Sequence, residues 1–224
     1  MAQRGLRERN FQIMDKRKAK KIYDALRERY PDAHCALHYT SPLELLFSTI
    51  LSAQATDVGV NKATPALFKA FPTVESYTFA SPEEIEPYIS SIGLFRSKAK
   101  SLYTSANLIV DNFGGVVPEN MKDLLTLRGV ARKTANVVLG NAFKKNEGVV
   151  VDTHVGRLAQ RFGLTKETTP VKIEKDLMAL FPQKNWTMLS HLLVSHGRAV
   201  CKKRGGTCSD DDICKRYCSN ATTG

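Results

Sequence analysis

The chain has 224 residues, which is enough to bury one large core or two smaller ones. Hydrophobic residues make up 42% and charged residues 25%, and no apolar run reaches the roughly 18 residues that a membrane span needs. We therefore expect a globular protein without a membrane segment. The net charge of +11 favours a polyanionic partner such as nucleic acid, although an inert basic surface fits the same charge.

The N-terminal segment is the most basic part of the chain. Residues 1–29 hold ten basic residues against four acids, and they contain no apolar core of the kind found in a secretory signal. We therefore expect the protein in the cytoplasm. Ile22, Leu26 and Arg29 share one face of a helix expected from about Asp15. This helix fits either a DNA-facing arm or a solvated face, and the solvated face is the simpler interpretation.

Helix signals recur along the chain, and we expect an all-α fold. Residues 41–44 and 81–84 each place Ser at the cap, Pro at the first turn and Glu three residues after the cap. The first start opens 45–51, which is apolar on nearly every side and predicts a buried central helix. The only strand-like run is 149–151. Further helices are expected over about 57–71, 97–113, 118–127, 132–143, 153–162, 169–181 and 186–200.

The expected helices over 118–127 and 132–143 are joined by only four residues, a tight turn that contains glycine. Such a turn points backbone N–H groups outward, where they can hold a phosphate without reading base identity. An ordinary helix hairpin is the alternative interpretation. The residues that would face DNA are Gly129, Val130, Ala131 and Arg132.

Four of the five cysteines crowd the C-terminal end of the chain. In a reducing compartment such a group indicates a metal site rather than disulfides. Four thiolates suit an iron–sulfur cluster or zinc, but a structural zinc site favours two close pairs and only the last two cysteines are close. Cys35 lies far away and is interpreted as a small buried hydrophobe. The candidate ligands are Cys201, Cys208, Cys214 and Cys218, separated by six, five and three residues.

The segment 127–138 resembles the helix-hairpin-helix of the endonuclease III family. Val-Asp-Thr-His at 151–154, in which Asp152 lies nineteen residues after Lys133, resembles the aspartate motif of that family. Leu-Ser-Ala-Gln-Ala-Thr-Asp at 51–57 and Ile-Gly-Leu at 92–94 also match. The resemblance runs from about residue 20 to 218, which is nearly the whole chain.

The resemblance implies a bifunctional DNA glycosylase and apurinic/apyrimidinic lyase of base excision repair. Lys133 would displace a damaged base to form an imine with the sugar, and β-elimination would then cut the strand. The positive end of the helix dipole disfavours an ammonium ion at Lys133 and so favours the nucleophilic amine. Asp152 would assist, although taken alone it fits a helix N-cap. The adenine-excising relatives usually lack this lysine, so oxidised pyrimidines in duplex DNA are the expected target.

The same resemblance assigns residues that hold DNA from which a nucleotide has been flipped out. Gln54 would fill the hole in the stack and Leu94, forty residues later, would wedge beside it. His154 fits either a phosphate contact or a structural histidine. The partner is therefore expected to be double-stranded DNA that contains a damaged base or an abasic site, bound by a monomer.

Two regions depart from the family pattern. The hairpin has Arg128 and Ala131 where the family usually has proline and a second glycine, and alanine would cost about 1 kcal/mol if that position needs a positive φ. The resemblance implies a [4Fe–4S] cluster, but the family spaces its cysteines by six, two and five residues. The third and fourth family cysteines would fall at Asp211 and Tyr217, so a cluster would need a rearranged loop.

We expect two helical lobes. A barrel over 36–146 would contain the hairpin over 118–143, and a second lobe would combine 1–35 with 147–224 and the cluster loop over 201–218. The cleft between the lobes is expected to hold the lysine and the aspartate. Two alternatives remain: a glycosylase of different lesion specificity, such as mismatch or adenine excision, and a catalytically silent helix-hairpin-helix DNA-binding protein.

Overall fold

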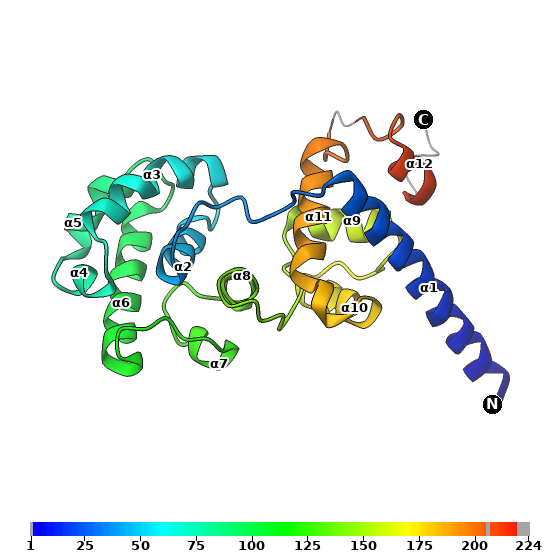
Figure 1. Ribbon diagram of the computed structural model, residues 1–224, viewed down its shortest axis with the longest axis horizontal. Coiled ribbons are helices and arrows are strands. Elements are labelled where there is room, and N and C mark those ends of the chain that lie inside the picture. Colours follow the sequence, from blue (N-terminus) through cyan, green and yellow to red (C-terminus); the bar gives the residue numbers. More distant parts are fainter. Residues whose placement is uncertain (1, 205–206, 219–224) are drawn as a thin grey trace. The chain divides into compact units, whose positions relative to one another are not determined.

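The computed structural model describes residues 2–204 and 207–218, with side chains from residue 16 onward (Figure 1). This part of the chain contains helices and connecting segments but no strand, which confirms the all-α expectation. Among its helices, none is long and apolar enough to cross a membrane. The chain divides into two compact units: unit 1 combines Met1–His34 with Gly148–Gly224, and unit 2 is Cys35–Glu147.

Unit 2 is built around α2 (Pro42–Leu51), in which every side chain from residue 45 to 51 is buried. This confirms the predicted central helix. Helix α2 packs against α3, α6 and α8, so three sides of it are covered. The other helices of unit 2 are α3 (Asp57–Ala70), α4 (Val74–Thr78), α5 (Pro82–Ile89), α6 (Phe95–Phe113), α7 (Met121–Leu124) and α8 (Arg132–Ala142).

The two Ser-Pro starts cap their helices as the sequence predicts. Ser81 and Glu84 form a reciprocal capping box at the start of α5. At the start of α2 the Ser41 side chain accepts from the backbone N–H of Glu44 (3.2 Å), but the Glu44 carboxylate turns back to Thr40 instead. Both helices therefore begin at their proline.

The helix expected over 118–127 is wrong in length, because α7 is a single turn. The Asn120 side chain accepts from the backbone N–H of Asp123 (3.0 Å) and so starts the helix three residues later than expected. After Leu124, the N–H groups of Thr126 and Leu127 bond to carbonyls three residues back, which tightens the chain into the turn.

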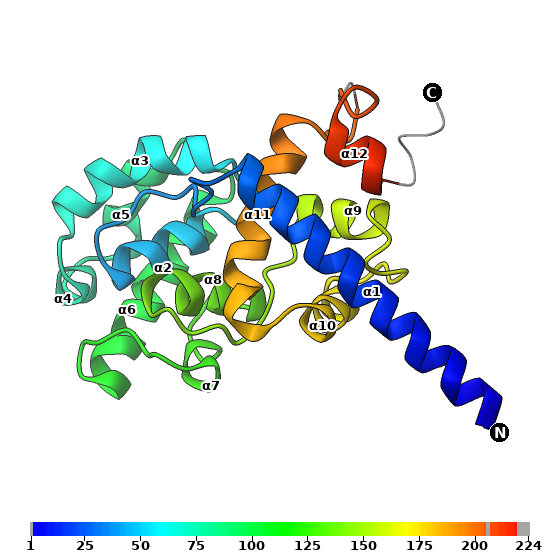
Figure 2. The same cartoon turned by 45° about the vertical axis from the view of Figure 1, so that its right-hand side comes forward.

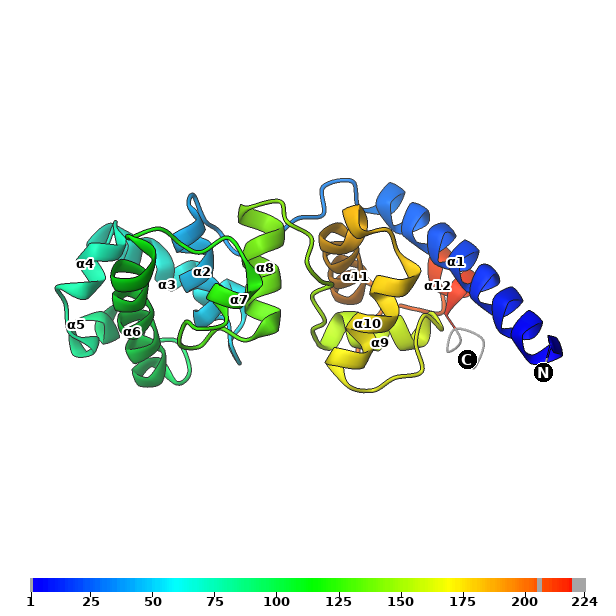
Figure 3. The same cartoon turned by 90° about the horizontal axis from the view of Figure 1, so that it is seen from below.

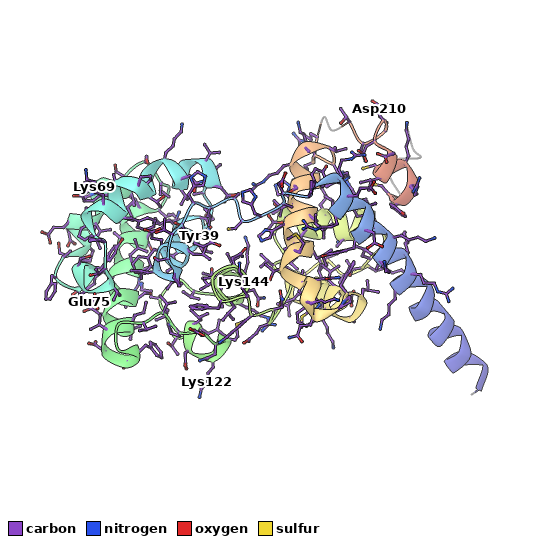
Figure 4. The ribbon with its side chains drawn as sticks, viewed as in Figure 1. Tyr39, Lys69, Glu75, Lys122, Lys144 and Asp210 are labelled. Atoms are coloured by element: carbon purple, nitrogen blue, oxygen red, sulfur yellow. The ribbon has the colours of Figure 1, made fainter. Side chains whose placement is uncertain are left out.

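Helix α8 ends in a left-handed residue that is not glycine. Lys144 has φ 57°, and the N–H of Lys145 donates to the carbonyl of Leu139 (2.9 Å). A left-handed residue after a helix is usually glycine, because glycine adopts this conformation without strain. Figure 4 labels Lys144 beside α8.

Unit 1 packs α9 and α11 together, with α1 and α10 against them. Helix α1 begins at Ala2 rather than near Asp15, and from residue 16 onward its buried side chains are those of Ala19, Ile22 and Leu26. Residues 149–151 do not form a strand. Val149 and Val151 are buried in the core of unit 1. The helices are α1 (Ala2–Arg29), α9 (Thr153–Arg161), α10 (Pro170–Leu180), η1 (Gln183–Asn185), α11 (Trp186–Ala199) and α12 (Asp212–Tyr217).

Candidate functional site

The hairpin turn between α7 and α8 is held tightly against the helices behind it. Gly129 has φ 81°, and a Cβ atom at this position would lie 3.2 Å from Ile50 Cγ2 and 3.3 Å from Ser101 Cβ. The hydroxyl of Ser105 donates to the carbonyl of Arg128 (2.9 Å). Glycine is therefore required here both by the left-handed backbone and by the close approach to α2 and α6.

Ala131 is the N-cap residue of α8, and its φ of −97° lies in the extended region. The cost expected for alanine at this position therefore does not arise. No side chain caps the helix, so the N–H groups of its first turn, including that of Lys133, have no acceptor within the helix. Lys133 and Arg132 are exposed, and the guanidinium of Arg132 donates to the carbonyl of Glu147 (3.4 Å).

Val130 differs from its neighbours in the turn. Its side chain is buried, and its N–H donates to the carbonyl of Leu127 (3.2 Å). Val130 therefore anchors the hairpin in the core, while Gly129, Ala131 and Arg132 are exposed.

Gln54 and Leu94 share an uncommon backbone conformation. Gln54 has φ 54° and Leu94 has φ 61°, both in the left-handed region, and both residues are exposed, Leu94 to 62%. Left-handed conformations cost a non-glycine residue about 1–2 kcal/mol, and such strain gathers at functional sites. Leu94 is also the N-cap residue of α6 and makes no side-chain cap bond.

In unit 1, Asp152 is the N-cap residue of α9. Its Oδ1 accepts from the backbone N–H of Val155 (2.8 Å), and the residue is half-buried. Capping engages one carboxylate oxygen and fixes the rotamer of the side chain. The structural interpretation of Asp152 is therefore correct, and it is compatible with a chemical role for the other oxygen.

His154 lies in the first turn of α9, and its side chain packs against α11. Its Nδ1 lies 3.2 Å from the guanidinium of Arg157, and a Cβ atom on Gly197 would lie only 2.9 Å from that nitrogen. The ring therefore occupies a fitted position next to a cation, which favours the structural role over a phosphate contact.

Helix α9 begins after its N-cap residue Asp152, and two arginine side chains on the helix contact Cys201, the first cysteine of the C-terminal group. Arg157 donates to the carbonyl of Cys201 through Nε (3.1 Å) and Nη2 (2.8 Å), and Arg161 donates to Sγ of Cys201 (3.0 Å). Neither arginine was predicted from the sequence to contact the cysteines. Their spacing of four residues, which places them on one face of a helix, is the signal that could have found them.

Three of the cysteine sulfurs, those of Cys201, Cys208 and Cys214, lie within 4.8 Å of one another, and Cys218 is buried in the same core. The hydrogen bond with Cys214 and the guanidinium of Arg161 lower the pKa of the Cys201 thiol to about 5. The same hydrogen bond raises the pKa of Cys214 above its ordinary range. A thiolate beside further thiols is a donor set suited to a metal cluster.

Asp211 stands where the family pattern expects the third cysteine, and its side chain has structural contacts. Asp211 is the N-cap residue of α12, accepting from the N–H of Cys214 (2.9 Å), and it pairs with Arg29 (2.9 Å). His196 is also buried here, with Tyr30 2.9 Å from its Nδ1 and the sulfur of Cys214 3.3 Å from its Nε2. Burial lowers the pKa of His196, so the ring is neutral at pH 7.

Comparisons with known proteins place this geometry in a family. Residues 47–183 match the family model described as HhH-GPD superfamily base excision DNA repair protein. The endonuclease III of Synechocystis sp. is 51% identical over 195 residues, covering 87% of this chain and 89% of the relative. Two solved structures, a non-covalent endonuclease III–DNA complex and a trapped endonuclease III–DNA covalent intermediate, match with TM-score 0.88 and 36% identity. Each match covers 93% of this chain and 97% of the other.

Replacing Gly129 by alanine tests the packing of the hairpin. The added Cβ must occupy a left-handed backbone and press on Ile50, so we expect Gly129→Ala to lower the free energy of unfolding by about 1–3 kcal/mol in urea titrations. Ala131→Gly is the matched control, because Ala131 has a negative φ; its effect should stay within about 0.5–1 kcal/mol. Equal losses in both variants would contradict this account of the turn.

Proposed function

The chain belongs to the endonuclease III family of HhH-GPD base excision DNA repair proteins, and we propose that its Lys133 and Asp152 carry out base removal and strand cleavage on damaged DNA. The chain is accordingly a DNA glycosylase and apurinic/apyrimidinic lyase of base excision repair. The observation that carries the residue assignment is an exposed lysine in the uncapped first turn of α8, directly after the hairpin. One chain holds both groups, so a monomer suffices.

Lys133 acts as the nucleophile. Its neutral amine bonds to C1′ of the flipped nucleotide, and the bond from C1′ to the base breaks, with the base leaving as an anion that takes up a proton. Ring opening gives an imine between the lysine and the sugar. Loss of a proton from C2′ then expels the 3′ phosphate by β-elimination, so one amine serves both steps.

Asp152 assists through the carboxylate oxygen that does not cap α9. A negative charge there stabilises the positive charge that develops on the sugar, or accepts a proton from the attacking amine. Because the cap bond to Val155 holds the carboxylate in one rotamer, the charge is positioned before substrate binds.

The substrate is duplex DNA with an oxidised pyrimidine or an abasic site. A lysine at position 133 favours the branch that also cleaves the strand. Gly129, Ala131 and Arg132 offer backbone N–H groups and a positive charge to a phosphate. Gln54 and Leu94, exposed in strained conformations, fill the space left by the flipped nucleotide.

A [4Fe–4S] cluster fits the donor set of the C-terminal group. Cys201, Cys208, Cys214 and Cys218 would hold it, since three of their sulfurs already lie together and the fourth is buried beside them. When bound, the cluster supplies a covalent cross-link that fixes the loop between these cysteines. The chain provides the supporting contacts through Arg157 and Arg161.

Borohydride trapping tests the nucleophile. Reduction during turnover on an abasic duplex should leave a covalent protein–DNA adduct, and Lys133→Gln should lower its rate of formation at least about a thousandfold. Lys122→Gln is the control, because Lys122 is an exposed lysine on α7 of the same hairpin (Figure 4). An adduct that forms at an unchanged rate in Lys133→Gln would refute the assignment.

Asp152→Asn separates capping from chemistry. Asparagine caps helices as well as aspartate does, so the free energy of unfolding should change by less than about 0.5 kcal/mol. The single-turnover rate of base excision should fall about a hundredfold or more, because the charge is lost. Asp32→Asn, which removes an exposed carboxylate of the same unit, should leave the rate unchanged. Full activity of Asp152→Asn would rule out a chemical role for the carboxylate.

The cluster assignment predicts a brown protein that absorbs near about 400 nm and contains about four iron atoms per chain. Cys214→Ser should lose most of this iron, because the serine hydroxyl replaces a buried thiol ligand. Cys35→Ser should keep it, because Cys35 lies in unit 2. A colourless, folded protein that binds zinc instead would show that the cysteines hold a different metal.

A further inference from the structure

Helix α1 carries an exposed basic face that the catalytic residues do not use. The face consists of Lys16, Arg17, Lys20 and Lys21, all exposed, and we call it the basic face of α1. Of these four cations, Lys20 is paired, with Asp24. The buried residues of the same helix lie on its other side, against the core of unit 1.

The charge on this face works against the helix itself. Lys16 and Lys20 are four residues apart, as are Arg17 and Lys21, and like charges at this spacing destabilise a helix. Residues 2–21 carry eight basic residues against two acids, which is +6 of the chain's net charge of +11. A polyanion bound to this face would remove the repulsion.

The N-terminal half of α1 also projects from its unit. Helix α1 packs against α10, α11 and α12. In Figures 1 to 3 its N-terminal half (dark blue), which ends just before the basic face of α1, lies clear of these helices in every view. The twenty residues from Ala2 to Lys21 span about 30 Å, the length of about nine base pairs.

We propose that the basic face of α1 is a second DNA-binding surface, which contacts backbone phosphates regardless of sequence or lesion. The inference rests on the proposed function, because it takes DNA as the polyanion. In the described part of α1 the apolar side chains Ala19, Ile22 and Leu26 are committed to the core, so no apolar stripe remains there to enter a lipid surface. Phosphate contacts of this kind raise non-specific affinity and speed the search along DNA.

Salt titration of binding to undamaged duplex tests the proposal. The variant Lys16→Gln/Arg17→Gln/Lys21→Gln removes three charges and leaves helix propensity nearly unchanged. With a duplex of about 30 base pairs, the slope of log K against log salt should fall by about 1–3, and Kd at 50 mM salt should rise at least about threefold. With a duplex of about 10 base pairs, the difference in slope between the variant and the wild-type protein should be smaller.

The matched control is Lys69→Gln/Lys175→Gln/Lys184→Gln, which removes three exposed charges elsewhere, Lys69 among them at the end of α3 (Figure 4). Equal slopes for variant and control would overturn the proposal. So would a variant that loses binding to vesicles of anionic phospholipid but keeps the wild-type slope on duplex DNA. Trapping of an abasic duplex by wild-type protein reports separately on Lys133, so its failure would refute the proposed function and not the slope result.

Discussion

The close approach at Gly129 is the constraint on which the hairpin depends. Gly129 is left-handed, and a Cβ atom at this position would press on Ile50 and Ser101, so the turn lies close against α2 and α6. Because α8 begins two residues after Val130, the turn also fixes where the first helical N–H groups point. A flexible loop here would still carry a lysine, but the amine would lack both a defined position and the dipole of the helix behind it.

Unit 1 uses a helix in a comparable way. Helix α9 is capped by Asp152 at one end, and Arg157 and Arg161 hold Cys201 from its side. The Asp152 carboxylate and the loop that carries Cys201 are thus attached to one helix. A shift of the loop that carries Cys201 would be transmitted to α9 through these arginine contacts. Gly197 lets α11 pack closely against α9, which limits such movement.

Much of this architecture follows from local sequence. The capping signals at Ser41 and Ser81 predicted two helix starts, and the apolar run after Ser41 predicted the central helix α2, because local bonds and burial agree there. The length of α7 was mispredicted, since Asn120 competes with the earlier proline as the helix start. Helix α12 was missed for a related reason: its cap, Asp211, stands where the family pattern places a cysteine.

The site was partly predictable. The lysine, the aspartate and the cysteines stand out by residue type and spacing, whereas the arginines around Cys201 depend on contacts forty residues apart in the chain. The cost considered for Ala131 depended on a positive φ at that position, but the residue is extended, and in this turn Gly129 is the left-handed residue. The backbone conformation of a turn depends on the helices that pack against it, and a local sequence pattern contains no information about those helices.

Gln54 and Leu94 limit how this protein can be improved. Both occupy backbone conformations that glycine adopts without penalty, so a search for thermostable variants would select glycine at either position. Each such gain would delete a side chain that we propose fills the space left by the flipped nucleotide. Directed evolution for heat tolerance and selection for repair would therefore push these two positions in opposite directions.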